Sequence, residues 1–265
     1  MSAGSTTGVR RRSSRDSPGA WFNEIRGACY ATPCWKRFRD DRKMKMDYDV
    51  VNLFSEPELS GLTSLFATLP VDPYLKAGFR AKSIMRVRIE NGTVRKETHE
   101  PLQILSSRKF VAPGGTIIRD YPEIPERYLN GALTRAILTY VERCAIEPQR
   151  EILVQAHRIT SIGKAPSLPV TEGPHQDGMD YVGMLCVSRE NITGGASQVL
   201  ADRTTVLFER TLQPGDLLLM DDQVYFHYAT PTSCVDQARN GYRDILIFST
   251  PSARPSEFVS AVEYL

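Results

Sequence analysis

The segment GDLLLMDDQVYFHYATPTSCVDQARNGYRDILIFST, residues 215–250, alternates short apolar runs with turn residues. Aromatic and β-branched side chains are frequent in the runs, and Pro231 and the pair Asn240-Gly241 stand between them. Runs of this composition with such boundaries are typical of antiparallel strands. The pattern begins at residue 151, and the strands that we predict are 151–162, 181–190, 197–201, 204–212, 215–222, 224–231 and 242–250. Many short strands at regular spacing predict a mainly β protein built on a jelly roll.

The N-terminal half has a more mixed pattern. Ser55 and Glu58 form a capping box that predicts a helix up to Pro70, and apolar residues at helical spacing predict a second helix over 130–145. The pair Asn91-Gly92 predicts a hairpin. We therefore expect a disordered basic tail at 1–20, a helical and mixed support region at 21–150 and a jelly-roll core at 151–265, with one compact domain from about residue 47.

Composition narrows the class of protein. The net charge of +2 gives no argument for a nucleic-acid partner, and no apolar run approaches the length needed to cross a bilayer. Five cysteines without a C-x-x-C pair indicate a reduced protein. The Arg- and Ser-rich N-terminus mildly resembles a transit peptide but has too few apolar residues for an amphipathic helix. We therefore expect a cytoplasmic protein without nucleic-acid or membrane partners, while the oligomeric state stays open.

The chemistry depends first on His175 and Asp177. Side chains two residues apart on a strand face the same way, so an imidazole and a carboxylate could bind one ion. His227, which lies before the turn at Pro231, is the better third ligand, and His157 is the weaker candidate. Two histidines and one carboxylate on one face leave three positions of an octahedron open, as in non-haem Fe(II) oxygenases. H-x-D alone is a weak motif, and on this pair alone a surface turn is the better interpretation.

Arg243 favours the iron site over that alternative. It begins an otherwise apolar strand, where an arginine is costly to bury without an anion. A guanidinium can hold a carboxylate with two parallel hydrogen bonds, and 2-oxoglutarate supplies such a carboxylate. The alternative is a structural ion pair with Asp244 or another acid.

These residues belong to blocks that resemble a known family. The blocks are LPVDPYLKAGFRAKSIMRVRI, APGGTIIRDYPEIP, HRITSI, EGPHQDGMDYVGMLCVSRENITGGASQVL, PGDLLLMDDQVYFHYATP and GYRDILIFST. They resemble the 2-oxoglutarate/Fe(II)-dependent dioxygenases typified by isoleucine 4-hydroxylase, a free amino acid hydroxylase, from about Leu69 to Thr250. The resemblance implies a double-stranded β-helix, iron held by the two histidines and Asp177, and 2-oxoglutarate bound by Arg243.

The resemblance also implies the reaction. Fe(II), 2-oxoglutarate and O2, with ascorbate in vitro, would oxidise an unactivated C–H bond of a free aliphatic amino acid to give a hydroxylated product, succinate and CO2. Oxidative ring closure of the aziridine type or desaturation in secondary metabolism is an alternative, as is hydroxylation of a peptide or protein side chain. A metal-binding jelly-roll module is the non-enzymatic alternative.

Three further side chains are candidates for substrate binding. Arg158 could hold a substrate carboxylate, in which case alternation would turn His157 outward. Tyr181 could line the substrate pocket, and Gln198 could reach it. The alternatives are a surface charge for Arg158, core packing for Tyr181 and a structural role for Gln198. The pair Asp221-Asp222 is interpreted as a strand end rather than an acid/base site, so we expect no catalytic residue beyond the iron centre.

Overall fold

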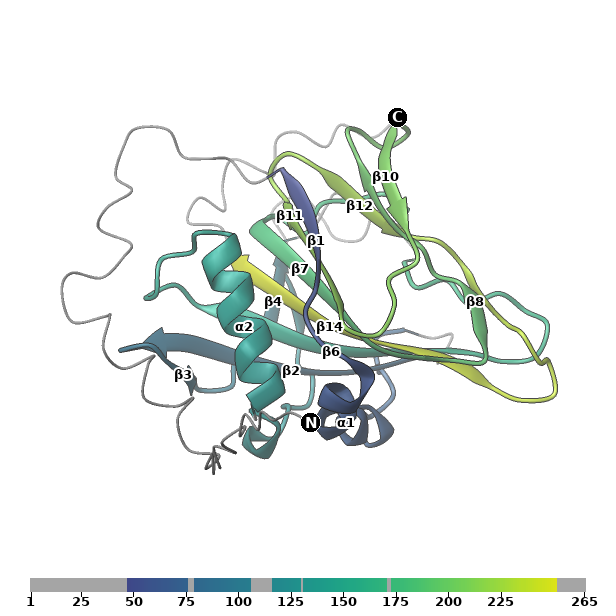
Figure 1. Ribbon diagram of the computed structural model, residues 1–265, viewed down its shortest axis with the longest axis horizontal. Helices are drawn as coiled ribbons and strands as arrows, with labels where there is room; N and C mark the ends of the chain where they lie inside the picture. Colours follow the sequence, from purple (N-terminus) through teal and green to yellow (C-terminus); the bar gives the residue numbers. More distant parts are fainter. Residues whose placement is uncertain (1–46, 76–78, 106–115, 130, 171–172, 252–265) are drawn as a thin grey trace, which may run out of the picture. The chain divides into compact units, whose positions relative to one another are not determined.

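A seven-stranded antiparallel sheet is the largest element of the computed structural model, in the order β1-β11-β7-β14-β6-β2-β3 (Figure 1). The structure describes residues 47–75, 79–105, 116–129, 131–170 and 173–251, all within the compact unit Lys45–Leu265. The elements are β1 Tyr48–Asn52, α1 Glu56–Ala67, β2 Arg80–Glu90, β3 Thr93–Lys96, β4 Leu102–Leu105, β5 Thr116–Arg119, η2 Glu126–Tyr128, α2 Gly131–Arg143, β6 Ile152–Ser161, β7 Met179–Glu190, β8 Ile192–Gly194, β9 Ser197–Leu200, β10 Val206–Arg210, β11 Asp216–Asp221, β12 Phe226–Ala229, β13 Thr232–Cys234 and β14 Gly241–Pro251.

Local sequence signals explain where these elements begin and turn. The backbone N–H of Ser55 donates to Glu58 Oε2 at 2.8 Å, which confirms the capping box at the start of α1. Asn91 and Gly92 have φ of 50° and 78°, so the β2–β3 hairpin turns through two left-handed residues as predicted. Gly215, with φ of 91°, precedes β11, where an added Cβ would lie 1.9 Å from the carbonyl oxygen of Phe54.

The large sheet has two different faces. One face packs against α1 and α2 in a core that includes Leu62, Ile137, Leu219 and Phe248. The other face supplies Met184, Leu218 and Ile245 to a second core with Val199 of β9. We call this second face the inner face, because it looks toward the smaller sheet β10-β9-β12. The two sheets therefore enclose a second core, which is the arrangement of a jelly roll.

The predicted fold class is confirmed, because the described residues are mainly β with two supporting α-helices and antiparallel sheets. The predicted support region contributes more than support, since β1, β2 and β3 join the same sheet as the C-terminal strands. The predicted tail at 1–20 and the start of the support region lie outside the described residues. None of the described helices is long and apolar enough to span a membrane.

Candidate metal centre

His175 and His227 meet in an isolated antiparallel bridge between the segment before β7 and strand β12. The N–H of His175 donates to the carbonyl of His227 at 3.1 Å, and the reverse bond measures 2.8 Å. Residues that exchange both backbone bonds stand directly opposite each other and present their side chains on one face. Their ring centroids are 4.3 Å apart. The bridge thus explains how two histidines that are distant in sequence come together.

Asp177 completes a set of three ligand atoms that lie within 4.8 Å of one another. Its Oδ1 is 3.5 Å from Nε2 of His175, and its Oδ2 is 3.7 Å from Nε2 of His227. Burial by itself would raise the pKa of Asp177, but the charges of His227 and His175 outweigh it and hold this pKa well below its usual range. Asp177 is therefore a carboxylate near neutral pH, as a metal ligand must be.

The outer nitrogen of each imidazole faces an oxygen acceptor. Nδ1 of His175 donates to the carbonyl oxygen of Gly173 at 3.0 Å, and Nδ1 of His227 lies 3.3 Å from Oδ1 of Asp222. The first contact is a hydrogen bond and the second an ion-pair contact, and an oxygen beside Nδ1 favours the tautomer that leaves Nε2 with a lone pair for a metal. Two imidazole nitrogens and one carboxylate oxygen at these separations fit a non-haem Fe(II) site.

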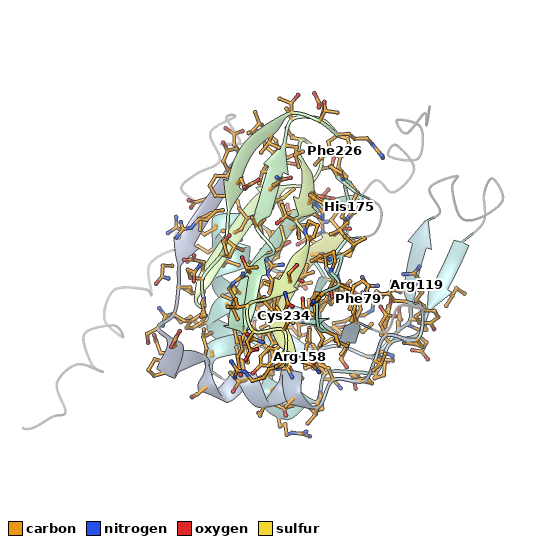
Figure 2. All side chains as sticks on the ribbon, turned by 90° about the vertical axis from the view of Figure 1, so that its right-hand side faces the viewer. Phe79, Arg119, Arg158, His175, Phe226 and Cys234 are labelled. Carbon is orange, nitrogen blue, oxygen red and sulfur yellow. The ribbon has the colours of Figure 1, made fainter. Side chains whose placement is uncertain are left out.

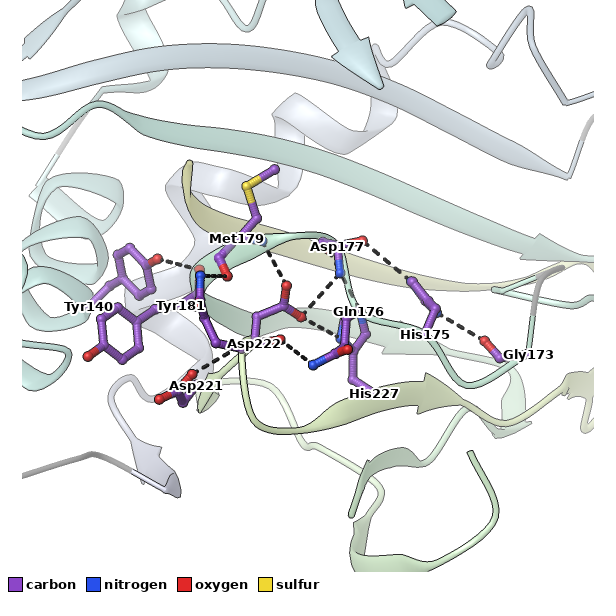
Figure 3. A network of polar contacts seen from close by, with 11 residues as sticks. Tyr140, Gly173, His175, Gln176, Asp177, Met179, Tyr181, Asp221, Asp222 and His227 are labelled. Carbon is purple, nitrogen blue, oxygen red and sulfur yellow. Dashed lines mark hydrogen bonds and ion pairs between the residues drawn. The ribbon is translucent and has the colours of Figure 1, made fainter. Parts of the chain in front are cut away.

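Asp222 holds this centre together from the end of β11. Its carboxylate is fully buried and accepts the backbone N–H groups of Asp177 at 3.2 Å and Met179 at 2.9 Å. The side-chain amide of Gln176 donates to the carbonyl of Asp222 at 2.8 Å. Figure 3 shows the Asp222 carboxylate between His227 and the H-x-D turn. The sequence interpretation as a strand end missed this role, although a second aspartate directly before the His227 segment was its visible signal.

Arg243 lies on the inner face of β14 and is 4% exposed. Its Nη2 donates to Oγ of Ser197 at 3.0 Å, while its Nε is buried without a hydrogen-bond partner among the described residues. Asp244, the predicted alternative partner, is bound instead by Arg158. Burial lowers the pKa of Arg243 to about 10, and nearby Arg189 adds to this effect. Arg243 is thus a buried cation for which the described residues provide no carboxylate.

Arg189 is a second arginine at the same place, half-buried, and the sequence analysis missed it. It stands directly opposite Arg243 in the β7–β14 register. Its Nη2 donates to the carbonyl of Gly194 at 2.7 Å, and its Nη1 is buried without a hydrogen-bond partner among the described residues. Gly195 lies against both arginines, since an added Cβ would be 3.3 Å from Arg243 Cδ, a tight contact, and 3.5 Å from Arg189 Nη1, an ordinary one.

The structure places Arg158 away from the iron ligands. Its guanidinium donates twice to the carboxylate of Asp244, with both bonds at 2.7 Å, and lies 4.1 Å from the ring centre of Tyr242. Figure 2 shows Arg158 and His175 well separated. Alternation along β6 puts His157, not Arg158, on the inner face, because His157 stands opposite Ile245 of the second core. This placement supports the other alternative of the sequence analysis, in which Arg158 does not point into the pocket.

Tyr181 and Gln198 also point away from the iron ligands. Tyr181 packs against the core beneath the helices, and its carbonyl accepts a hydrogen bond from Tyr140 at 2.8 Å (Figure 3). Gln198 donates to Glu209 and is half-buried, while its neighbours Ser197 and Val199 on either side are buried. Strand alternation therefore supports core packing for Tyr181 and a structural role for Gln198, the alternatives to substrate binding.

The jelly roll and the His-Asp-His set together define a non-haem Fe(II) oxygenase. The chain belongs to the 2OG-Fe dioxygenase family, whose sequence model matches residues 63–249. Fe(II) is therefore its metal, and 2-oxoglutarate is its co-substrate. Among curated proteins, no relative matches the chain.

Solved structures of low sequence identity share the fold. A bsmA homolog from Methylobium petroleophilum PM1 has a TM-score of 0.64 and 21% identity, over 78% of this chain and 89% of the homolog. IDO from Bacillus thuringiensis has a TM-score of 0.55 and 16% identity, over 78% and 93% of the two chains. The Fe(II)/α-ketoglutarate-dependent dioxygenase TqaL has a TM-score of 0.57 and 16% identity, over 74% of this chain and 75% of TqaL. At these identities the similarity shows the fold alone.

Proposed function

We propose that this dioxygenase oxidises an unactivated C–H bond of a free aliphatic amino acid and forms the hydroxylated amino acid, succinate and CO2. Support for the amino-acid substrate comes from the blocks of residues 69–250 that resemble the isoleucine 4-hydroxylase type. Among the described residues, the buried cysteines Cys144, Cys186 and Cys234 are free thiols, which supports the further proposal that the enzyme works in the reducing cytoplasm.

The observation that carries the use of 2-oxoglutarate is the pair Arg243 and Arg189 on the inner face. Burying two like charges side by side is costly unless an anion joins them. We assign the distal carboxylate of 2-oxoglutarate to this pair, because guanidinium groups match the geometry of a carboxylate. The hydroxyl of Ser197, 3.0 Å from Arg243 Nη2, can donate to the same carboxylate. The inner face would then hold 2-oxoglutarate between the arginine pair and the iron ligands.

Each residue has a defined part in the overall reaction, in which substrate R–H, O2 and 2-oxoglutarate give R–OH, succinate and CO2. His175, Asp177 and His227 would hold Fe(II), which couples the oxidative decarboxylation of 2-oxoglutarate to substrate oxidation when it is bound. Asp222 fixes the orientation of His227 and the backbone of the H-x-D turn. The second core excludes water from one side of the site, which protects a reactive centre from side reactions.

The test combines succinate release with product mass. Purified protein is incubated with Fe(II), ascorbate, 2-oxoglutarate and a panel of free amino acids. Succinate release that depends on one amino acid, with a product one oxygen heavier, supports the proposal. A product two hydrogens lighter would replace hydroxylation by ring closure or desaturation. Failure of every amino acid to raise succinate above the uncoupled rate would refute the proposed substrate class.

Two variants test the assigned residues in the same assay. His227→Ala should abolish iron-dependent succinate release, because it removes one of the three ligands. Arg243→Ala should raise the 2-oxoglutarate concentration needed for half-maximal rate by roughly 10- to 100-fold, the loss expected for a buried charged hydrogen bond. Arg239→Ala is the matched control, since Arg239 is exposed and pairs only locally with Asp236. An unchanged requirement in Arg243→Ala would place the anchor elsewhere.

A further inference from the structure

Lys82 is a buried lysine on the inner face of β2. It is only 7% exposed. In the sheet register it stands directly opposite His157 of β6, which in turn stands opposite Ile245 of β14. Residues opposite each other in neighbouring strands share a face, and Ile245 belongs to the core between the two sheets. Lys82 and His157 therefore lie side by side on the face that carries Arg243.

No carboxylate of the described residues lies within ion-pair distance of the Lys82 ammonium group. Asp72, the nearby acid of the same region, is bound by Arg80 at 2.6 Å. The ammonium group instead lies 4.2 Å from the ring centre of Tyr121. A cation–π contact offsets only part of the cost of removing an ammonium ion from water. The site is thus built with a surplus positive charge.

His157 adds an unused hydrogen-bonding group beside this charge. Its Nε2 is buried without a hydrogen-bond partner among the described residues. Burial, followed by the charges of Lys82 and Arg80, lowers the pKa of His157 well below its ordinary value, so the ring is neutral near pH 7. A neutral imidazole can donate one N–H to an oxygen acceptor. A carboxylate placed here would satisfy His157 and neutralise Lys82 together.

The electrostatics of Lys82 agree with an unfilled anion site. Burial and then the charge of Arg80 lower its pKa to about 7, against the opposing charges of Asp72 and Asp177. The charged or titratable groups that act on this site from the surrounding strands and loops are Asp72, Arg80, Arg119, Tyr121, His157 and Asp177. The two carboxylates among them already serve Arg80 and the metal centre.

The position of Lys82 separates it from the 2-oxoglutarate anchor but not from the iron ligands. Strand β6 lies between β2 and β14, and Arg243 is two residues along β14 from Ile245, which is in register with Lys82, so the backbones of Lys82 and Arg243 are roughly 12 Å apart. The charge of Asp177 raises the pKa of both Lys82 and His157, so these side chains interact through space with one of the metal ligands. An anion at Lys82 could therefore accompany 2-oxoglutarate at the arginine pair on the same face.

We propose that Lys82 and His157 form the binding site for a carboxylate group of the substrate. This inference rests on the proposed function and deepens it, because it selects substrates with a free carboxylate over amides, amines and residues inside a peptide. The α-carboxylate of a free amino acid meets the requirement. A peptide bond at the same position lacks the negative charge that Lys82 would pair with.

The test uses four aliphatic L-amino acids, valine, leucine, isoleucine and norleucine, and their carboxamides. Each is added to protein loaded with Fe(II) and 2-oxoglutarate under argon, so that the arginine pair is filled and no turnover occurs. At least one amino acid should raise the thermal unfolding midpoint, and its carboxamide should not. Calorimetry of that pair should give an affinity difference of roughly 10- to 100-fold, the range for one buried charged hydrogen bond.

Two substitutions connect the preference to the site. Lys82→Met should remove the preference for the carboxylate while leaving the 2-oxoglutarate requirement unchanged, and His157→Phe should weaken it. Without amino acid, Lys82→Met should unfold at the same or a higher temperature than the wild type, since it replaces an unpaired buried cation by an apolar chain of similar length. The control is Lys96→Met on neighbouring β3, because Lys96 pairs with Glu123 at 2.9 Å.

The outcomes separate this inference from the proposed function. If no amino acid stabilises the protein more than its carboxamide, or if Lys82→Met keeps the preference, the carboxylate site is refuted. Iron-dependent release of succinate would still support the oxygenase in that case. A large drop in the unfolding midpoint of Lys82→Met without ligand would also overturn the inference, because it would show that Lys82 stabilises the fold rather than a ligand.

Discussion

The substitution Asp222→Asn tests whether the iron ligands depend on the buried carboxylate behind them. Asp222 Oδ1 accepts the N–H of Asp177 at 3.2 Å and lies 3.3 Å from Nδ1 of His227. Its Oδ2 accepts the N–H of Met179 at 2.9 Å. Asparagine keeps the shape but turns one oxygen into an N–H donor. The new side-chain NH2 group of the asparagine must then face either His227 or the N–H of Met179, and each of these is itself a hydrogen-bond donor.

The size of the effect follows from these contacts. If the remaining oxygen faces His227, the buried N–H of Met179 loses its acceptor, which costs about 1–3 kcal/mol of folding free energy. If it faces Met179, the His227 imidazole loses the partner that fixes its tautomer. Loss of such a partner costs a metal site about 10- to 100-fold in affinity, equivalent to about 1.4–2.8 kcal/mol. We expect both a lower Fe(II) affinity and a lower folding free energy, and the fall in Fe(II) affinity is the more certain of the two.

Anaerobic titration with Fe(II) and thermal unfolding measure the two effects separately. Asp221→Asn is the matched control, because Asp221 is the adjacent buried aspartate and accepts the N–H of Gln223 at 2.9 Å instead of contacting the ligands. Fe(II) affinity should fall only in the Asp222 variant. Wild-type affinity in Asp222→Asn, with the fold intact, would refute the assignment of Asp222 as the positioning residue of the centre.

Three further changes have defined outcomes. Arg189→Ala should raise the 2-oxoglutarate concentration needed for half-maximal succinate release by about tenfold, and no change would leave Arg243 as the sole anchor. Gly215→Ala should lower the free energy of unfolding in urea by at least about 2 kcal/mol, because φ is 91° and the new Cβ would lie 1.9 Å from Phe54 O; a wild-type midpoint would refute the clash. The pKa of Lys82, near 7 in the folded protein against an ordinary 10.5, means that between these values the unfolded chain holds a proton that the folded chain has released. The stability advantage of Lys82→Met should therefore be full below pH 7 and shrink above it by up to about 1.4 kcal/mol per pH unit, and an advantage independent of pH would contradict the shift.

The strands and the metal ligands were predictable because both depend on local patterns. Each predicted strand from residue 151 onward overlaps an observed one, from β6 to β14. His175 and Asp177 are two residues apart, so the sequence itself shows that they belong together. His227 needed only the further assumption that strands distant in sequence meet in a jelly roll. The short strands β8 and β13 were missed, since three residues are too few to show alternation.

The substrate candidates could not be predicted in the same way, because strand alternation alone does not say which parity faces inward. For β6 the sequence AHRIT offers a histidine and an arginine in succession, and it leaves open which of the two faces inward. Long-range pairing separates the alternatives, since Arg158 binds Asp244 on the neighbouring strand. Lys82 was overlooked for a related reason: its partner residue, His157, is 75 positions away, and no local pattern links them.

The two faces of the large sheet show how stability and activity are divided in this fold. The face beneath α1 and α2 carries aliphatic and aromatic side chains from every central strand. The hydroxyl of Tyr140, which α2 places against this face, forms a hydrogen bond of 2.8 Å with the hydroxyl of Thr250. The inner face carries three cationic side chains, the buried Lys82 and Arg243 and the half-buried Arg189, for which no described acid is a partner. Such groups destabilise a free protein. Their concentration on the face next to the iron ligands is expected if two carboxylate ligands, 2-oxoglutarate and the substrate, supply the missing negative charges. The same arrangement predicts that each of the two ligands stabilises the iron-bound protein by RT ln(1 + L/Kd), where L is the free ligand concentration, so that the fully loaded enzyme is more stable than the iron-bound protein by the sum of these two terms.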